Sequence, residues 1–162
     1  MNAVLRDERA LLPMMIGDLK AVVAIESAAY DFPWTRGNFV DSLAAGYLAR
    51  VLCTAPGRIV GYFVAMKGVG EMHLLNLTVA PSEQGQGHAR HMLDELVAMC
   101  RVQRAEQLWL EVRESNTRAC SLYARYGFKQ VGVRRGYYPA LHGRREDAAV
   151  MSLDVVGSRD VD

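Results

Sequence analysis

The sequence predicts an α/β protein with a mixed (α+β) central sheet and helices on both of its faces. Two patterns predict this class. Apolar runs separated by turn residues come first, and strands then alternate with long amphipathic stretches. The early strands would pair antiparallel, whereas the later strand-helix-strand order requires parallel neighbours. With 162 residues the chain can bury one core, and we expect a single domain over residues 1–154.

Apolar spacing and turn signals predict each element in order. Thr35 is a good N-cap for the second helix, and Gly127 would end the last one. A polar tail, residues 155–162, closes the chain, and we expect it to be flexible. The predicted elements are a helix at 18–30, a helix from Thr35 to about 45, a hairpin of 47–53 and 59–66, a strand at 72–79, a helix at 87–104, a strand at 108–113, a helix at 116–126, and strands at 128–134 and 147–154.

The segment from Val79 to Arg90 joins a predicted strand to a predicted helix through a Pro-Ser turn and two glycines. Such a junction presents unpaired backbone N–H groups and the positive end of a helix dipole to one small volume, which suits a pyrophosphate. No Gly-Lys-Ser/Thr follows Gly87, and a third glycine at dinucleotide-fingerprint spacing is missing, so both of those loops are excluded. A plain glycine-rich turn is the alternative.

Charge and cysteine content exclude several classes of protein. A formal net charge of +1, with scattered basic residues, argues against nucleic-acid binding. Cys53, Cys100 and Cys120 form no C-x-x-C pair, which is typical of core thiols in a reducing cytosol. The N-terminus lacks a signal-peptide pattern, and no apolar run approaches about 18 residues, which argues against export and membrane insertion. We therefore expect a cytoplasmic protein.

The four histidines do not form a metal site. His73, His88, His91 and His142 are spread along the chain, and none belongs to an H-x-x-x-H pair or to an adjacent carboxylate set of metal type. We therefore expect no metal.

Residues 108–128, LWLEVRESNTRACSLYARYGF, hold the candidate catalytic side chains. In an extended strand Trp109, Glu111 and Arg113 share the face opposite the apolar residues, so Glu111 is the carboxylate of a strongly apolar strand. Tyr123 lies in the helix that follows. The alternatives are a solvated strand face for Glu111 and a core aromatic for Tyr123.

Four motifs occur in a fixed order along the chain. They are Phe32-Pro33-Trp34, Gln84-x-x-Gly87-x-Ala89, L-W-L-E-V-R-x-S-N-x-x-A-x-x-L-Y-x-x-x-G-F at 108–128, and Arg134-Arg135-Gly136-Tyr137-Tyr138-Pro139. Together they resemble the RimI branch of the GNAT superfamily, bacterial enzymes that acetylate the N-terminal alanine of ribosomal small-subunit protein eighteen. Matches run from about Phe32 to Met151, which is most of the chain.

The resemblance implies a GNAT fold, with a mostly antiparallel central sheet splayed at the cofactor site, and acetyl-coenzyme A as cosubstrate. It implies an acceptor protein N-terminus, that of ribosomal small-subunit protein eighteen. Glu111 would be the general base, and Tyr123 the general acid that protonates the leaving thiolate. The cofactor-binding residues that it implies are Leu77, Thr78 and Val79 of a bulged strand, Gln84, Gly85, Gln86, Gly87, His88, Ala89 and Arg90 around the pyrophosphate, and Asn116.

The pyrophosphate loop departs from the family's pattern at four positions. Gln84 replaces the commoner arginine and Gly85 a basic residue, while His88 replaces an aliphatic residue and Ala89 a glycine. These differences bear on side-chain contacts to phosphate more than on a backbone cradle.

The chemistry of amine acetylation explains the need for these residue types. An α-amino group with a pKa of roughly 7.8 is about 14% neutral at pH 7, and a lysine near 10.4 is below about 0.1%, so a base is required. An exposed carboxylate is a weak base, and we therefore expect Glu111 to be partly buried beside Trp109 and to act through a water. A backbone N–H at the strand bulge would stabilise the oxyanion.

Two adjacent tyrosines and a proline seldom form a purely solvated loop, and the family clasps its acceptor peptide with this segment. The resemblance therefore assigns acceptor contacts to Trp34, Arg135, Tyr137 and Tyr138. A solvated hairpin tip is the alternative.

The sequence thus indicates an N-terminal protein acetyltransferase. A GNAT enzyme for another protein or a small-molecule amine, and a non-catalytic acyl-coenzyme A sensor, are the alternatives. The presence of both Glu111 and Tyr123 favours an enzyme, and the tyrosine-rich loop favours a peptide acceptor.

Overall fold

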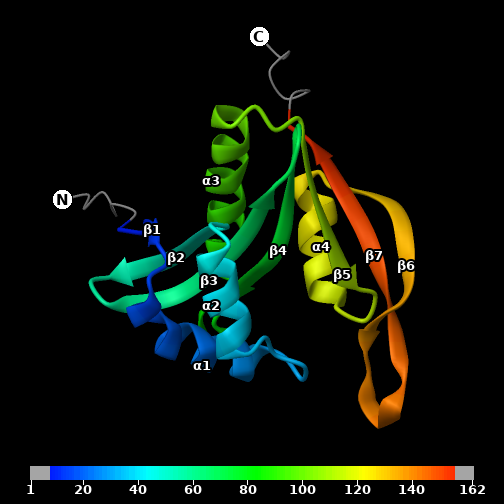
Figure 1. The fold of residues 1–162 in the computed structure, drawn as a ribbon, viewed down its shortest axis with the longest axis horizontal. Coiled ribbons are helices and arrows are strands. Elements are labelled where there is room, and N and C mark those ends of the chain that lie inside the picture. The colour runs from blue at the N-terminus through cyan, green and yellow to red at the C-terminus, as the bar shows by residue number, and fades with distance from the viewer. Residues whose placement is uncertain (1–7, 156–162) are drawn as a thin grey trace, which may run out of the picture. The chain divides into compact units, whose positions relative to one another are not determined.

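The computed structural model describes residues 8–155 as a mixed α/β fold (Figure 1). Short 3₁₀ turns lie at Ile16–Asp18, Pro81–Glu83 and Leu141–Gly143. The helices and strands are β1 (Ala10–Pro13), α1 (Leu19–Ala29), α2 (Arg36–Ala44), β2 (Leu48–Ala55), β3 (Arg58–Lys67), β4 (Glu71–Val79), α3 (His88–Val102), β5 (Gln107–Arg113), α4 (Thr117–Tyr126), β6 (Lys129–Pro139) and β7 (Arg145–Asp154).

Hydrogen bonding joins the strands into a seven-stranded sheet in the order β1-β2-β3-β4-β5-β7-β6. The β1–β2, β5–β7 and β6–β7 ladders are antiparallel, and the β4–β5 ladder is parallel. The predicted mixed sheet is therefore confirmed. In the parallel ladder Glu71–Leu74 pair with Gln107–Leu110. This register does not include the last five residues of β4, 75–79.

The structure differs from the predicted elements at three places in the chain. Strand β1 was not predicted; it is four residues long, ends in Pro13, and is a strand because it pairs with β2. Strand β6 continues through Tyr137, Tyr138 and Pro139, which the sequence placed in a loop, because a bulge after Arg134 lets Tyr138 pair with Glu146 of β7. Val155, assigned to the flexible tail, is 1% exposed and its N–H donates to the carbonyl of Glu106. Residues 156–162 of that tail lie outside the described residues.

The chain forms two compact units, one of residues up to 64 and 76–92, the other of residues 65–75 and from 93 onward. In the first, the apolar face of α1 buries Leu19 and Val22 together with one charged residue, Glu26. Thr35 caps α2 as predicted, accepting from the backbone N–H of Asn38. The single domain over 1–154 stays a prediction.

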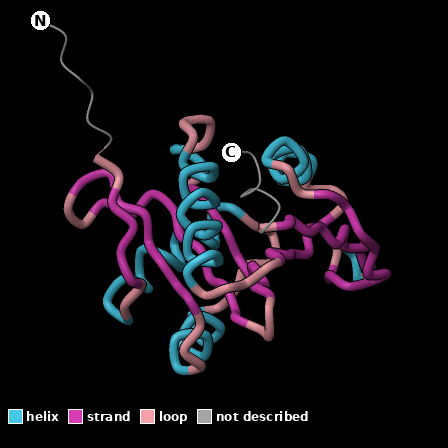
Figure 2. Tube along the Cα trace, turned by 90° about the horizontal axis from the view of Figure 1, so that it is seen from above, coloured by secondary structure: helices cyan, strands magenta, loops and turns pink. Residues whose placement is uncertain are grey.

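The second unit contains β5, β7 and β6 side by side, with α4 against one face of these strands (Figures 1 and 2). Exposure alternates along β5 as predicted, with Leu108, Leu110 and Val112 buried. Asn116 caps α4 by accepting from Ala119, and the positive φ of Gly127 ends it. Strand β5 therefore presents Trp109, Glu111 and Arg113 on its other face.

Candidate active site

The glycine loop forms a backbone cradle in the first unit. Gly85 and Gly87 both have φ of +81°, a conformation that side chains with a Cβ rarely adopt. The first turn of α3 follows directly at His88. The leading N–H groups of a helix have no partner within the helix, so a glycine loop that ends at a helix N-terminus is suited to an anion.

Side chains brace this loop from outside. Arg9, far away in sequence, donates to the Gly87 carbonyl at 3.2 Å, and Gln84 donates to the Val79 carbonyl at 3.3 Å. Arg58 pairs with Glu83 at 2.7 Å, and His88, which is 6% exposed, lies 4.0 Å from the same carboxylate. The remaining loop residues assigned to the cofactor, Gly85, Gln86, Ala89 and Arg90, are half-buried or exposed.

The C-terminal half of β4 carries the strand residues assigned to the cofactor. Thr78 and Val79 are buried, and Leu77 is half-buried. Gly61 of β3 lies against this segment so closely that a Cβ there would come within 2.8 Å of the Thr78 carbonyl oxygen. Thr78 Oγ1 donates to Asn76 at 2.7 Å and lies 2.7 Å from the Tyr30 hydroxyl. The segment is thus fixed from two sides.

Sequence reasoning missed the buried carboxylate of Glu26, which organises this region. Its side chain accepts from the Tyr62 hydroxyl at 2.7 Å, from the Asn76 amide at 2.8 Å and from the backbone N–H of Trp34 at 2.8 Å. Burial raises the pKa of Tyr62 above its ordinary value, and the charge of Glu26 raises it further. One signal was available, because Glu26 stands four residues after Val22 on the predicted apolar face of α1.

Glu111 lies in the second unit, on the face of β5 opposite the buried leucines. Its side chain is 6% exposed. One oxygen, Oε2, is 2.6 Å from His73 Nε2, and the other, Oε1, is 3.3 Å from Arg134 Nε. His73 stacks on Trp109 with ring centroids 3.6 Å apart and planes 9° from parallel. The expected burial of Glu111 near Trp109 is present, whereas its contacts to His73 and Arg134 were not predicted.

Tyr138, near the end of β6, is electrostatically coupled to the same carboxylate. Burial raises the pKa of the Tyr138 phenol, and the charge of Glu111 is the next largest cause. The Arg113 guanidinium lies 4.5 Å above the Tyr138 ring, and Arg134 lies 5.4 Å from the Tyr137 ring centroid. Tyr137 is 42% exposed. The polar face of β5 and the end of β6 thus share one cluster of aromatic and cationic groups.

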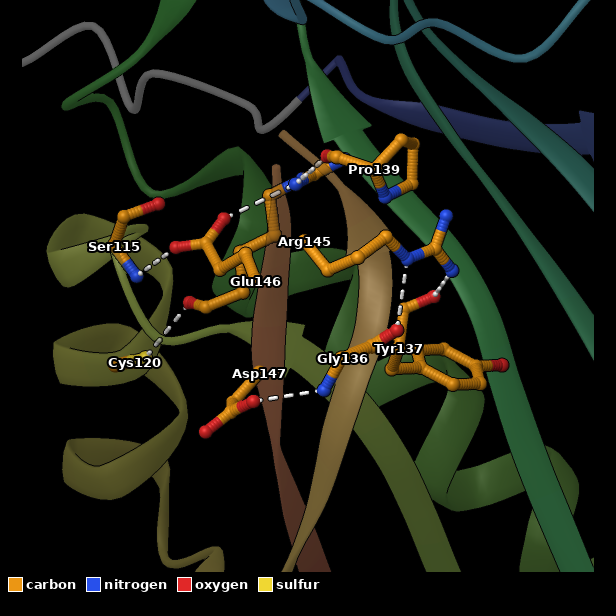
Figure 3. A network of polar contacts seen from close by, with 9 residues as sticks. Ser115, Cys120, Gly136, Tyr137, Pro139, Arg145, Glu146 and Asp147 are labelled. Carbon is orange, nitrogen blue, oxygen red and sulfur yellow. Dashed lines mark hydrogen bonds and ion pairs between the residues drawn. The ribbon is translucent and has the colours of Figure 1, made fainter. Parts of the chain in front are cut away.

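Polar contacts hold the end of the β6–β7 hairpin in place (Figure 3). Arg145 donates to the carbonyls of Gly136 and Tyr137 at 3.0 and 3.2 Å. Arg113 donates to the Pro139 carbonyl at 2.7 Å and to Glu146 at 3.0 Å. These contacts cross between β5, β6 and β7 and hold the backbone that carries the two tyrosines.

Three other predicted site residues have structural contacts. Tyr123 is 6% exposed and packs edge-to-face on Phe128 at 5.4 Å, and Asn116 caps α4. Trp34 packs on Phe39 at 5.2 Å. Arg135 is exposed on β6. Within residues 8–155 no three His, Cys, Asp or Glu side chains gather as a metal site would require.

Comparison with known proteins identifies the family. The match to the acetyltransferase (GNAT) family covers residues 19–128. The chain belongs to that family. It is 37% identical over 136 residues to the [ribosomal protein bS18]-alanine N-acetyltransferase of Haemophilus ducreyi, covering 84% of this chain and 93% of the relative. It is 37% identical over 138 residues to the Escherichia coli K12 protein of the same name, covering 85% and 92%.

A solved structure agrees with this assignment. The crystal structure of the ribosomal-protein-S18-alanine N-acetyltransferase from Escherichia coli superposes with a TM-score of 0.82 at 34% identity, covering 91% of this chain and 94% of that one. Ard1 from Thermoplasma volcanium, at 22% identity and a TM-score of 0.79, shares the fold. The predicted GNAT fold and the resemblance to the RimI branch are confirmed, and the protein is an N-acetyltransferase. No helix within residues 8–155 is long and apolar enough to cross a membrane.

Proposed function

We propose that the protein transfers the acetyl group of acetyl-coenzyme A to the α-amine of the N-terminal alanine of ribosomal small-subunit protein eighteen. The observation that carries this proposal is Glu111, a buried carboxylate on the polar face of β5, joined to the tyrosine-bearing hairpin through Arg134. Relatives named for this acceptor support it. An acidic group held among aromatic and cationic neighbours suits a base that meets an incoming peptide amine.

The glycine loop is the part of the chain that fits a pyrophosphate. Its N–H groups would bind the phosphate oxygens, and the first turn of α3 would add the positive end of its dipole. Since Gln84 is uncharged and Gly85 has no side chain, the backbone would make the contacts. We also propose that Leu77, Thr78 and Val79 bind the pantetheine arm and that Asn116 contacts the cofactor. The Val79 N–H would stabilise the oxyanion.

Acetyl transfer by direct attack needs one proton removed and one supplied. The amine nitrogen bonds to the thioester carbon, and Glu111 accepts the amine proton through a water molecule. The carbon–sulfur bond then breaks, and Tyr123 donates its phenolic proton to the sulfur. Solvent returns the proton from Glu111 to Tyr123, so the enzyme is restored.

The acceptor contacts are proposed for the hairpin and for the segment before α2. Tyr137 and Tyr138 offer aromatic area fixed by the Arg113 and Arg145 contacts. The exposed Arg135 and the half-buried Trp34 are the other residues proposed to contact the acceptor. Fixed aromatic side chains bind a peptide with little loss of conformational entropy.

A panel of acceptors tests the proposal. Purified protein receives acetyl-coenzyme A with peptides that begin with Ala, Ser or Met, the Ala peptide with a blocked α-amine and an internal Lys, and a polyamine. Mass spectrometry should locate the acetyl group on the α-amine of the Ala peptide. Acetylation of the blocked peptide's lysine or of the polyamine would replace the proposed acceptor with another amine, and binding without any transfer would favour the sensor.

A further inference from the structure

His73 of β4 makes a contact that the acetyltransferase motifs do not account for. In the parallel β4–β5 ladder it pairs with Trp109, and its ring stacks on that indole at 3.6 Å. Glu111 is two residues further along β5 on the same face, and its Oε2 lies 2.6 Å from His73 Nε2. The two side chains are 13% and 6% exposed.

The chemistry of the pair fixes the direction of this hydrogen bond. An ionised carboxylate can accept but not donate, so with Glu111 ready to act as a base the proton must be on His73 Nε2. A short bond to an ionised acceptor is stronger than a neutral one. The second donor, Arg134, is 51% exposed and lies 3.3 Å away, so His73 is the more buried and closer of the two.

We propose that His73 is a positioning residue for Glu111. Its Nε2–H holds Oε2, and the stack on Trp109 holds the imidazole, so the carboxylate keeps one orientation. This inference rests on the proposed role of Glu111 as the base. Loss of orientation at a reacting group reduces the rate more than it weakens binding, because a displacement of about 1 Å can cost about 100-fold.

Two substitutions separate the donor from the ring. His73→Phe keeps an aromatic ring to stack on Trp109 but removes the N–H, whereas His73→Gln keeps an N–H donor and loses the ring. We expect His73→Phe to reduce kcat about 10- to 100-fold, with acceptor KM and acetyl-coenzyme A affinity within about twofold of the parent. His73→Gln should recover at least part of kcat. Arg134→Gln provides the comparison at the other oxygen.

A double-mutant cycle shows whether His73 acts through Glu111. If it does, adding His73→Phe to Glu111→Gln should change kcat little beyond the effect of Glu111→Gln alone. Melting temperatures of all variants are measured so that a folding defect is recognised, and in that event His73→Gln replaces His73→Phe in the cycle.

Three results would overturn the inference. They are a His73→Phe enzyme with the parent's kcat, losses that multiply in the double variant, and an effect confined to KM. A Glu111→Gln enzyme with normal turnover is a different failure, because it would remove the proposed base itself and with it the role of His73.

Discussion

Gly87 is where the cradle can be tested with least disturbance to the rest of the chain. A Cβ added there would meet nothing closer than Arg9 Nη1 at 3.9 Å, so Gly87→Ala creates no steric collision within residues 8–155. Its φ of +81° makes alanine strained, at a cost of about 1–2 kcal/mol. For a chain of this length that corresponds to a fall in melting temperature of roughly 2–8 °C.

The effect on cofactor binding should be larger than this strain. If the alanine shifts the loop or occupies pyrophosphate space, at least one N–H bond to a charged oxygen is lost, worth about 1.5–3 kcal/mol. Calorimetry should therefore show a Kd for acetyl-coenzyme A raised about 10- to 150-fold.

Gly57 offers the matched control, since its φ is +74° and an added Cβ would meet nothing within 4 Å. Gly57→Ala should lower the melting temperature by a similar amount and leave the Kd unchanged. Equal Kd values for the two variants would refute the proposal that the loop at Gly87 binds the pyrophosphate.

Three further substitutions test other parts of the account. Tyr138→Ala should raise the peptide KM with little change in acetyl-coenzyme A affinity, and equal damage to both would indicate a structural tyrosine. Tyr123→Phe should slow turnover at every pH, because its task is to deliver a proton, and recovery at high pH would contradict that role. The side chain of Ser115, followed by Arg113 and the Ser115 backbone N–H, holds the pKa of Glu146 below its ordinary value of 4.5, so its stabilisation exists above that pH and is lost as pH falls through the folded-state value. The parent should therefore melt above Glu146→Gln at pH 6, by a gap that narrows as the pH falls below 4.5, and a constant gap between their melting temperatures would exclude the linkage.

Local signals predicted most of the fold. The N-cap at Thr35, the stop at Gly127 and the alternation along β5 each depend on neighbours in sequence, and each was confirmed. Strand β1 gave no such signal, because four residues ending in Pro13 are strand only through pairing with β2. The length of β6 depends on a bulge, which sequence spacing does not reveal.

The residues of the candidate site also fall into those that local sequence predicts and those that it does not. Motif residues such as Glu111 could be found from the sequence, because their strand and helix carry a continuous pattern. The partners of Glu111 could not, since His73 reaches it through the register of a parallel ladder and Arg134 through the β6–β7 hairpin. Contacts between residues distant in sequence follow from strand pairing, and strand register is not readable from composition or local spacing.

The turnover of Glu111→Gln most directly tests the central claim that this acetyltransferase uses a buried carboxylate as its base. Glutamine keeps the size of the side chain, so the Kd for acetyl-coenzyme A should stay close to that of the parent. At pH 7 we predict a kcat lower by about 10²–10⁴-fold, partly restored at higher pH as more of the acceptor amine becomes neutral. A Glu111→Gln enzyme that acetylates the Ala peptide at the parent's rate would contradict the account.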